Sequence, residues 1–366
     1  MGKELGLRLI ILSHKKEIFN INRGNLLKEQ KQEKEVLLEV KNLRTYFYEK
    51  YEDTVWKVLD GVSFKVYRGK TLGIMGASGA GKSVMARSIL KLMDKPGKIE
   101  EGEVIYKGRD LLQIPEEELN EIRGKEIGLV LQDPIAAIDP LMNMTGTTSQ
   151  PYLAHREYKG DRIKEDIRML VIKHFGHVAI PKPDTTADQY RHQLSGGIAQ
   201  RVRIAAAVIN NPELLVVDEP VAHLDATIAR QILELLHDMK RLYNLTMIFI
   251  AHNIGVIAEM SDYVAVMYAG KIMECADVET IFYSPRHPYT QGLFYAHPSV
   301  APKGQLTPIP GEVPNPSNYP KGCRFHPRCK YAITQCRKEE PPYEEYQPDY
   351  FIACWRAKDI PDYTRE

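Results

Sequence analysis

Gly76-Ala-Ser-Gly-Ala-Gly81-Lys82-Ser83 joins a predicted strand, Thr71–Met75, to a predicted helix, Val84–Met93. In that context a glycine-rich turn lets backbone N–H groups converge on phosphate oxygens, and the helix N-terminus adds partial positive charge. We expect the Lys82 ammonium to reach the β- and γ-phosphates and the Ser83 hydroxyl to ligate Mg2+. A chance glycine-rich turn with the same four fixed residues is expected in only about one chain in a hundred. The predicted nucleotide-binding residues are Gly76, Ala77, Ser78, Gly79, Ala80, Gly81, Lys82 and Ser83.

Composition narrows the class of protein further. The 366 residues carry 49 Lys plus Arg against 48 Asp plus Glu, so nothing in the overall charge favours nucleic acid. Five cysteines are too few for a secreted disulfide scaffold. Every apolar run is shorter than the roughly 18 residues that a membrane-spanning helix needs. The short apolar stretch near the start lacks a small-residue cleavage site after it, so we expect an uncleaved cytoplasmic start.

The chain divides by texture into four parts. Residues 1–35 are expected to be a solvated extension, with a membrane-surface helix as the alternative. Short apolar runs then predict strands, and Leu214–Val217 and Met247–Ile250 flank a helical pattern, which favours a parallel sheet in an α/β domain over 36–283. Within that domain, residues 133–205 form a third part with helical patterns and no clear buried strand, which predicts a helical insertion. Residues 284–366 form the fourth part, and 11 of the 23 prolines lie in 302–366, which excludes a run of long helices there.

Two further segments bear chemistry. Asp218-Glu219 follows the apolar run 214–217, where Asp218 could hold the water shell of a metal and Glu219 could deprotonate an attacking water. Taken alone, such a pair is more often a solvated strand end. Leu194-Ser195-Gly196-Gly197 opens a helical run and resembles a second anion-binding helix N-terminus. It predicts a second nucleotide shared across a dimer, against the alternative of an ordinary turn and helix cap.

Taken in order, these motifs, with Gln132, Leu224-Asp225 and His252, resemble the ATPase subunits of ABC transporters over residues 38–283. The resemblance implies a RecA-like P-loop nucleotide-binding domain with a β-rich N-terminal part and an inserted helical subdomain. It makes Glu219 the catalytic base and lets His252 contact the γ-phosphate. Gln132 would sense both the metal and the membrane subunits, so that Ser83, Gln132 and Asp218 serve Mg2+. The same resemblance places Ser195, Gly196 and Gly197 on the partner's γ-phosphate and Asp225 in the loop between the two sites. Phe47 would stack on adenine, with Tyr46 as the fallback and a plain core aromatic as the alternative.

The C-terminal part contains four of the five cysteines, Cys323, Cys329, Cys336 and Cys354. Four thiolates suit zinc or an iron–sulfur cluster, but the paired Cys-x-x-Cys knuckles usual for structural zinc are missing. With His287-Pro-Tyr-Thr-Gln-Gly292, this irregular Cys/Pro-rich part resembles the C-terminal extension of the di- and oligopeptide branch. That resemblance implies a 4Fe-4S cluster on the four cysteines, against zinc or free thiols as alternatives. Cys275 is expected to be a buried apolar residue.

Three positions depart from the family's pattern. Val221-Ala-His223 replaces small hydroxyl residues and alanine, Asn253 replaces an aspartate, and Met144–Pro151 breaks a pattern that normally begins a helix. We therefore expect weaker signalling between the two subunits of a dimer through the loop 221–223. The loss of one charge at Asn253 should have only a modest effect on the site. The helix that faces the membrane subunits is expected to be altered.

The expected function is that of an ATP-hydrolysing subunit at the cytoplasmic face of the membrane, energising import of dipeptides or oligopeptides. The expected partners are two transmembrane permease subunits, a second homologous ATPase and, through the complex, an extracytoplasmic solute-binding protein, with no nucleic acid. The alternatives are the same role in an oligosaccharide importer, a soluble non-transport ABC ATPase, or a regulatory protein that binds ATP without turnover.

Overall fold

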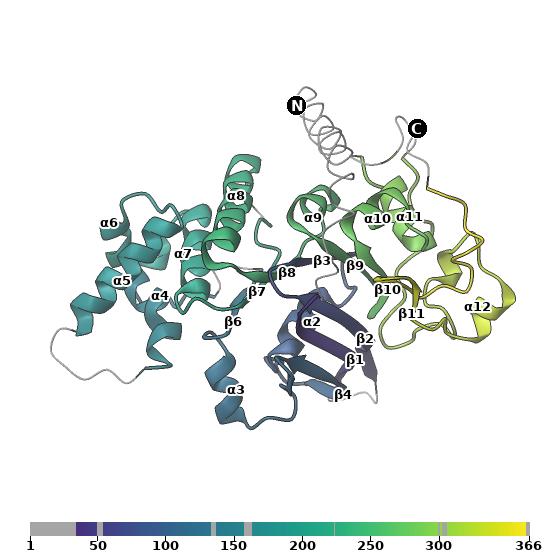
Figure 1. Cartoon of the computed structure of the whole chain (residues 1–366), viewed down its shortest axis with the longest axis horizontal. Coiled ribbons are helices and arrows are strands. Elements are labelled where there is room, and N and C mark those ends of the chain that lie inside the picture. Colours follow the sequence, from purple (N-terminus) through teal and green to yellow (C-terminus); the bar gives the residue numbers. More distant parts are fainter. Residues whose placement is uncertain are drawn as a thin grey trace. The chain divides into compact units, whose positions relative to one another are not determined.

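The computed structural model describes residues 34–49, 54–132, 137–156, 163–222, 224–298, 301 and 306–363 (Figure 1). The chain divides into the units Met1–Glu35 and Val36–Glu366, and all elements below belong to the second. The predicted N-terminal extension, up to residue 33, and His223 lie outside the described residues.

An eight-stranded sheet carries the fold, in the order β11-β12-β10-β9-β3-β8-β7-β6. Its strands β9, β3, β8, β7 and β6 are parallel, as the apolar runs predict. Strands β7 and β8 are buried along their whole length, since helices cover both faces. The strands are β3 (Thr71–Gly76), β6 (Ile127–Val130), β7 (Leu214–Asp218), β8 (Thr246–Ile250), β9 (Tyr263–Tyr268), β10 (Lys271–Asp277), β11 (Glu344–Gln347) and β12 (Tyr350–Ile352).

A second, antiparallel sheet forms the predicted β-rich N-terminal part, in the order β2-β1-β4-β5. Its strands are β1 (Val36–Tyr48), β2 (Val55–Tyr67), β4 (Gly97–Tyr106) and β5 (Arg109–Asp110). Alternating buried residues on β1 and β2 share one apolar core with β3 and the helix α2. This core places the small sheet against the phosphate loop.

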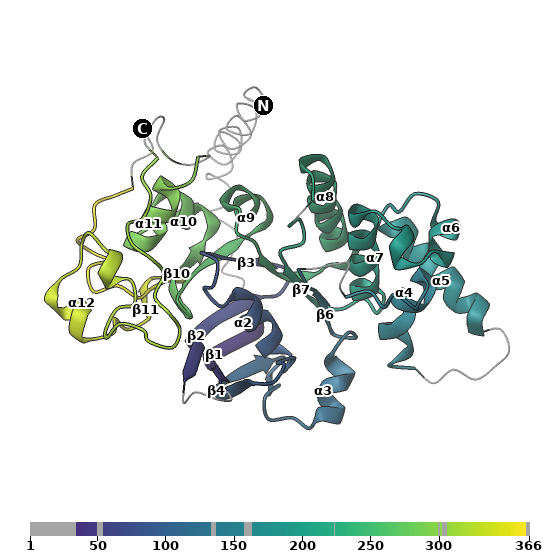
Figure 2. The same cartoon turned by 180° about the vertical axis from the view of Figure 1, so that it is seen from behind.

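Figures 1 and 2 show that one group of helices stands apart from the others. The helices α4–α7 pack on one another at one end of the main sheet and form the predicted helical insertion. None of the helices within the described ranges is long and apolar enough to cross a membrane. The helices are α2 (Lys82–Ile89), α3 (Glu116–Ile122), α4 (Met144–Leu153), α5 (Ile163–His177), α6 (Pro183–Asp188), α7 (Gly196–Val208), α8 (Ala226–Tyr243), α9 (Ile254–Met260), α10 (Val278–Tyr283), α11 (Pro288–Tyr295) and α12 (Thr334–Lys338), with 3-10 turns at Arg191–Gln193 and His326–Arg328.

Met144–Pro151, which departs from the family's helix-initiating pattern, is still helical. The segment forms most of α4, because Asn143 caps its N-terminus by accepting a hydrogen bond from the Gly146 N–H at 2.9 Å. Pro151 comes near the end of the helix, so its missing N–H removes only one bond there.

The C-terminal extension is joined to the main sheet by strand pairing. Strand β12 pairs antiparallel with β10, with Glu274 opposite Ile352 and Cys275 opposite Phe351. Over 306–363 the helices are short, as the proline content predicts. The extension therefore continues the main sheet.

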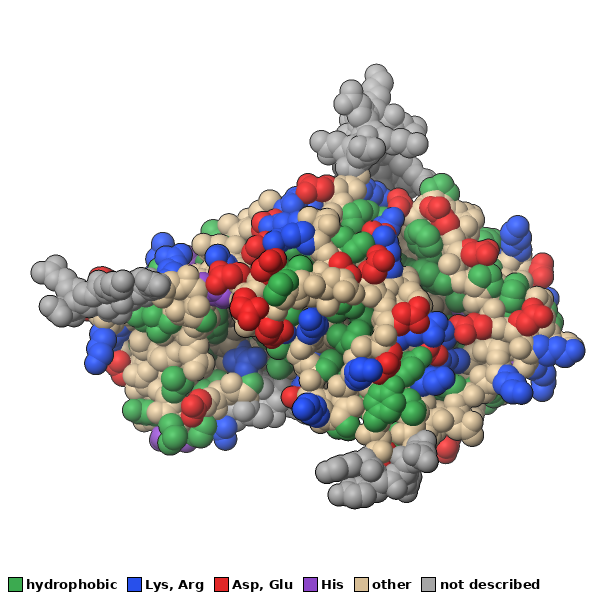
Figure 3. All heavy atoms as spheres, turned by 90° about the horizontal axis from the view of Figure 1, so that it is seen from below, with side chains coloured by type: hydrophobic (Ala, Val, Ile, Leu, Met, Phe, Trp, Pro, Cys, Tyr) green, Lys and Arg blue, Asp and Glu red, His purple; other side chains and the backbone are tan. Residues whose placement is uncertain are grey.

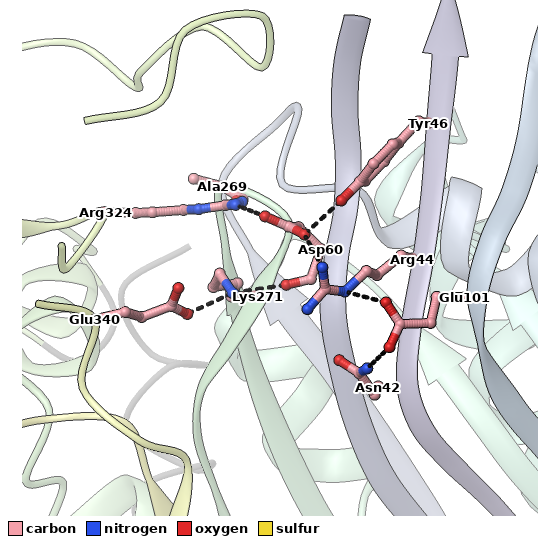
Figure 4. Close-up of polar contacts among 9 residues, drawn as sticks. All are labelled: Asn42, Arg44, Tyr46, Asp60, Glu101, Ala269, Lys271, Arg324 and Glu340. Atoms are coloured by element: carbon pink, nitrogen blue, oxygen red, sulfur yellow. Dashed lines mark hydrogen bonds and ion pairs between the residues drawn. The ribbon is translucent and has the colours of Figure 1, made fainter. Parts of the chain in front are cut away.

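An ionic network also ties the extension to the small sheet (Figure 4). The Arg324 guanidinium, in the extension, pairs with the Asp60 carboxylate on β2 and donates to the Ala269 carbonyl. The Tyr46 hydroxyl donates to the Asp60 carboxylate at 2.8 Å. The Lys271 ammonium donates to the backbone carbonyl of Asp60 at 2.7 Å. Burial raises the pKa of Asp60, but the Tyr46 hydrogen bond and the charges of Arg324, Lys271 and Arg44 outweigh burial and leave that pKa below its usual value.

Charged side chains are mixed on the molecular face drawn in Figure 3. Basic and acidic groups alternate there, with hydrophobic side chains between them. Surface ion pairs such as Lys107–Glu126, at 2.7 Å, reflect the same balance. Side chains of both signs thus occur on this face, in line with the near-zero net charge of the sequence.

Candidate nucleotide-binding site

The phosphate loop runs from the end of β3 to the start of α2, as predicted. Gly81 has φ +100°, and a Cβ there would lie 2.8 Å from the Val58 carbonyl and from the Leu59 side chain on β2. Only glycine fits this left-handed, crowded position. Ser78 and Gly79 are exposed at the apex, whereas Ala80 and Gly81 are buried against β2. The apex of the loop is therefore exposed, while the first residue of α2 is buried.

Lys82 is folded back onto the loop that precedes it. Its ammonium donates to the carbonyls of Gly76, at 3.0 Å, and Ala77, at 3.1 Å. Burial lowers the pKa of Lys82, while the carboxylates of Glu219 and Asp218 partly oppose that shift. The cation is therefore held over the loop by backbone oxygens and faced by two acids.

Asp218 ends the buried strand β7 and is itself 1% exposed. Burial raises its pKa, and a hydrogen bond from Ser83 partly opposes this. Its Oδ1 atom is buried without a hydrogen-bond partner among the residues that the structure describes. An orphaned carboxylate oxygen beside a hydroxyl is a donor set that suits the water shell of Mg2+.

Glu219 meets two other predicted site residues. The Gln132 side-chain amide donates to its Oε2 atom at 3.0 Å, and His252 Nδ1 lies 3.5 Å from the same oxygen. The Glu219 backbone is left-handed, with φ +46°, and its N–H donates to the Ile250 carbonyl at 2.9 Å. Such uncommon conformations for a residue with a side chain cluster at functional sites. Gln132, Glu219 and His252 thus form one group beside Lys82.

The Ser195 segment belongs to a second group of predicted residues. Ser195 caps α7 by accepting from the Ile198 N–H, and a Cβ on Gly197 would lie 2.7 Å from the Ile228 side chain on α8. Asp225 caps α8 through the N–H groups of Thr227, at 3.1 Å, and Ile228, at 3.0 Å. Helix α7 packs on α4, α5 and α8, whereas α2 packs on β1, β2, β3 and β7. The two groups therefore sit on different layers of the fold.

Asn253 caps α9 by accepting from the N–H groups of Gly255, at 2.9 Å, and Val256, at 3.2 Å. Asparagine and aspartate are comparable N-caps, so the departure at this position preserves the local structure next to His252.

Phe47 lies on β1 opposite Trp56, half-buried, and a Cβ on Gly97 would meet its ring at 2.9 Å. Tyr46 points instead into the Asp60 network (Figure 4). Because successive residues of a strand face opposite sides, the two aromatic side chains serve different surroundings.

The cysteines of the extension are all free thiols, with Cys323 and Cys336 buried. Burial raises the pKa of Cys323 to about 11 and that of Cys354 to about 12, and the neighbouring cysteines add to both shifts. Within the described ranges, no group of three or more His, Cys, Asp or Glu side chains is arranged to hold a metal ion. Cys275 lies on β10 opposite Phe351 and is only partly buried, so the expected full burial is not reached. Its partial burial still raises the pKa of its thiol to about 12.

One contact at the phosphate loop was not predicted. The hydroxyl of Tyr289, in α11, accepts a hydrogen bond from the Ala77 N–H at 2.9 Å. The segment His287–Gly292 was noticed only as a sign of the family, and nothing in its local pattern connects it with a loop 212 residues earlier.

Comparisons with known proteins identify the family of the chain. Residues 59–222 match the family described as "ABC transporter", and residues 273–336 match "Oligopeptide/dipeptide transporter, C-terminal region". An ATP-binding cassette solved as a dimer in a post-hydrolysis state with ADP and Pi is 26% identical. It aligns with a TM-score of 0.58 over 66% of this chain and 98% of its own.

Full-length relatives agree as well. Dipeptide transport ATP-binding protein DppD of Lactococcus lactis subsp. cremoris is 41% identical, covering 88% of this chain and 91% of the relative. Oligopeptide transport ATP-binding protein OppD of Bacillus subtilis is 40% identical, covering 87% and 88%. The chain belongs to the ATP-binding proteins of ABC transporters, and it is an ATPase. Within that class it falls in the oligopeptide/dipeptide transporter family.

Proposed function

We propose that this chain energises the import of dipeptides or oligopeptides by hydrolysing ATP at the cytoplasmic face of a membrane transporter. The observation that carries the proposal is the contact of Gln132 with Glu219 beside Lys82, in a chain whose C-terminal region matches the oligopeptide/dipeptide family. The relatives' names, DppD and OppD, support peptides as the cargo.

In this proposal the nucleotide phosphates lie on Gly76–Ser83, with Phe47 stacked on adenine. Ser83, Asp218 and Gln132 would hold Mg2+, which neutralises phosphate charge when bound. Glu219 takes the proton of the attacking water, and its partly buried carboxylate is already held by Gln132. His252, whose Nδ1 atom lies 3.5 Å from Glu219 Oε2, would contact the γ-phosphate.

The Ser195 group completes the site of a second subunit. Ser195, Gly196 and Gly197 form a helix N-terminus with a capped entry, a structure that suits a phosphate. Because that group sits on another layer from Lys82 in the same chain, we propose that it serves the nucleotide of a paired, homologous ATPase, and that Asp225 links the two sites. The other proposed partners are two transmembrane permease subunits and, through them, a solute-binding protein.

The tagged full chain should be pulled down in mild detergent from its native membranes, under anaerobic conditions. We expect two multi-span permease subunits, a second ATPase and a solute-binding protein to copurify. Proteoliposomes with that complex should accumulate labelled peptides when ATP is supplied. Lys82→Ala should abolish uptake, whereas Lys65→Ala, an exposed lysine on β2, should not. Recovery of the protein only from the soluble fraction, alone or with nucleic acid, would contradict the proposal.

In the part of the chain that the structure describes, no group of three or more His, Cys, Asp or Glu side chains is arranged to hold a metal ion. We nevertheless propose, from the resemblance to the di- and oligopeptide branch, that Cys323, Cys329, Cys336 and Cys354 come together to ligate a 4Fe-4S cluster when it is bound. Four thiols from separate segments interact electrostatically, since the other three contribute to the raised pKa of Cys354. Four thiolates are the usual ligand set of such a cluster. A cluster would cross-link four loops of an extension that contains only short helices and strands, so its role would be structural.

Anaerobically purified protein should contain iron and acid-labile sulfide in equal amounts. Cys336→Ser should lose both, and Cys275→Ser, the fifth cysteine, should retain them. Stoichiometric zinc, or protein without any metal, would contradict the cluster.

A further inference from the structure

One peptide unit of the phosphate loop is held from both ends. The carbonyl of Gly76 accepts from the Lys82 ammonium at 3.0 Å, and the N–H of Ala77, in the same peptide unit, donates to the Tyr289 hydroxyl at 2.9 Å. A trans peptide is planar with its C=O and N–H pointing in opposite directions. Tyr289 and Lys82 therefore lie on opposite sides of this unit, and fixing one end fixes the other.

Gly76 is the last residue of β3 and pairs with Met267 of β9, so the peptide unit that follows it lies at the end of this strand pairing. Gly76 has φ +155°, and the Met267 carbonyl on β9 occupies the place of a Cβ, 2.1 Å from where that atom would be. Glycine is required by this close approach, yet glycine also has the widest choice of backbone conformations. The Tyr289 hydrogen bond selects the conformation in which the Gly76 carbonyl faces Lys82.

Tyr289 is itself rigidly held. His287 caps α11, since its Nδ1 atom accepts from the Tyr289 N–H at 3.0 Å. Burial lowers the pKa of His287 to about 3, so the ring is neutral and can accept. The N–H of His287 donates to the buried carboxyl of Glu274 on β10 at 3.1 Å. The start of α11 is thereby attached to the main sheet.

Aromatic packing fixes the Tyr289 ring. Its centroid lies 4.6 Å from that of Tyr268 on β9 and 5.4 Å from that of Phe325. Tyr289 and Tyr268 are both fully buried. Phe325 lies between Cys323 and Cys329, so the segment that carries the cysteines forms one wall of the pocket around a hydroxyl aimed at the phosphate loop.

We propose that Tyr289 is a positioning residue of the ATP site, supplied by the C-terminal extension, which orients the Gly76–Ala77 peptide and through it the Lys82 ammonium. The inference rests on the proposed role of Lys82. It gives the extension a direct part in nucleotide binding, in addition to its packing against the sheet.

The test compares two substitutions that each remove one buried hydroxyl from the same aromatic cluster. Tyr289→Phe retains the ring and loses the bond to Ala77. Tyr268→Phe is the matched control, because its hydroxyl contacts Arg328, at 3.3 Å. Without the bond, nucleotide binding must order the peptide, so the Kd of the full chain for ATP and ADP should rise about five- to thirtyfold. The Kd of Tyr289→Phe for AMP should change less than about twofold, because AMP lacks the phosphates expected to contact Lys82 and so does not need the peptide to be ordered. Every Kd of Tyr268→Phe should also change less than about twofold, because that variant keeps the bond between Tyr289 and Ala77.

A purely structural role would change thermal stability without distinguishing ATP from AMP. Equal affinities of Tyr289→Phe and Tyr268→Phe for ATP would overturn the inference. Lys82→Ala distinguishes a failure of this inference from a failure of the proposed nucleotide site. If that variant still bound ATP normally, the proposed role of Lys82 in the site would be wrong. Hydrogen exchange of the nucleotide-free wild-type chain provides a test that needs no variant. The Ala77 amide should be protected, and rapid exchange there would also overturn the inference.

Discussion

The Gln132 amide donates to the Glu219 carboxylate across 3.0 Å, and this bond joins two regions of the molecule. Gln132 follows β6 at the edge of the sheet, just before the segment that leads to the helical group α4–α7. Glu219 follows β7 and is anchored to the Ile250 carbonyl of β8. Gln132 therefore links the proposed base to the end of the strand that precedes the helical group in the chain.

Replacing Glu219 by Gln removes the proposed base and retains its size. Turnover of ATP should fall about 100- to 10,000-fold, because a positioned base contributes that much to the rate. ATP affinity should persist, since Lys82 and the loop are unchanged. Single-turnover hydrolysis and equilibrium binding in the assembled complex provide the two measurements. Glu234→Gln, on the exposed face of α8, is the control. Full turnover in Glu219→Gln would exclude that residue as the base.

Asp60→Asn should destabilise the protein. The substitution leaves the Arg324 guanidinium, whose side chain is 6% exposed, without its carboxylate. Breaking a buried pair on one side costs about 3–5 kcal/mol. Urea unfolding followed by circular dichroism measures the change. Asp238→Asn, which removes the exposed partner of Arg241, should cost about 0.5 kcal/mol or less. Similar losses in both variants would show that the network in Figure 4 contributes no more than a surface pair.

The Asp60 contribution should also depend on pH. Its pKa is lowered in the folded protein, because the Tyr46 bond and three cations outweigh burial. Its stabilisation is therefore fully present above the unfolded-state pKa of about 3.9. It is lost as the pH falls through the lower folded-state value. The difference in unfolding free energy between wild type and Asp60→Asn should stay constant from neutral pH to about pH 5 and shrink below about pH 4. A difference that grows on acidification would contradict the assigned direction.

Phe47→Ala should weaken ATP binding about fivefold or more, since stacking of a base on an aromatic ring contributes about 1–3 kcal/mol. Binding of inorganic triphosphate, which has no base, should be unaffected. Phe47→Tyr should bind ATP normally. If both ligands weaken together, the ring acts through its packing on Gly97 and the adenine contact lies elsewhere.

Local patterns were sufficient for much of the fold. Continuous apolar runs such as Leu214–Val217 identified buried parallel strands, and the periodic segment from Ala226 identified α8, because both signals depend on neighbours within a few residues. Met144–Pro151 departs from the family's pattern and still forms a helix, because the Asn143 side chain caps its N-terminus.

The sequence by itself determined the phosphate loop, the Asp218-Glu219 pair and the helix cap at Ser195, since each is a contiguous motif whose chemistry depends on adjacent residues. Only the tertiary structure showed that Gln132 and His252 approach the same oxygen of Glu219. It also showed the ion pair between Arg324 and Asp60, and the hydrogen bond from the Ala77 amide to the Tyr289 hydroxyl. Those partners are 33 to 264 residues apart in the chain. Their pairing depends on sheet order and on how the extension closes over the β9–β10 turn, and one sequence contains no local signal for contacts of that kind.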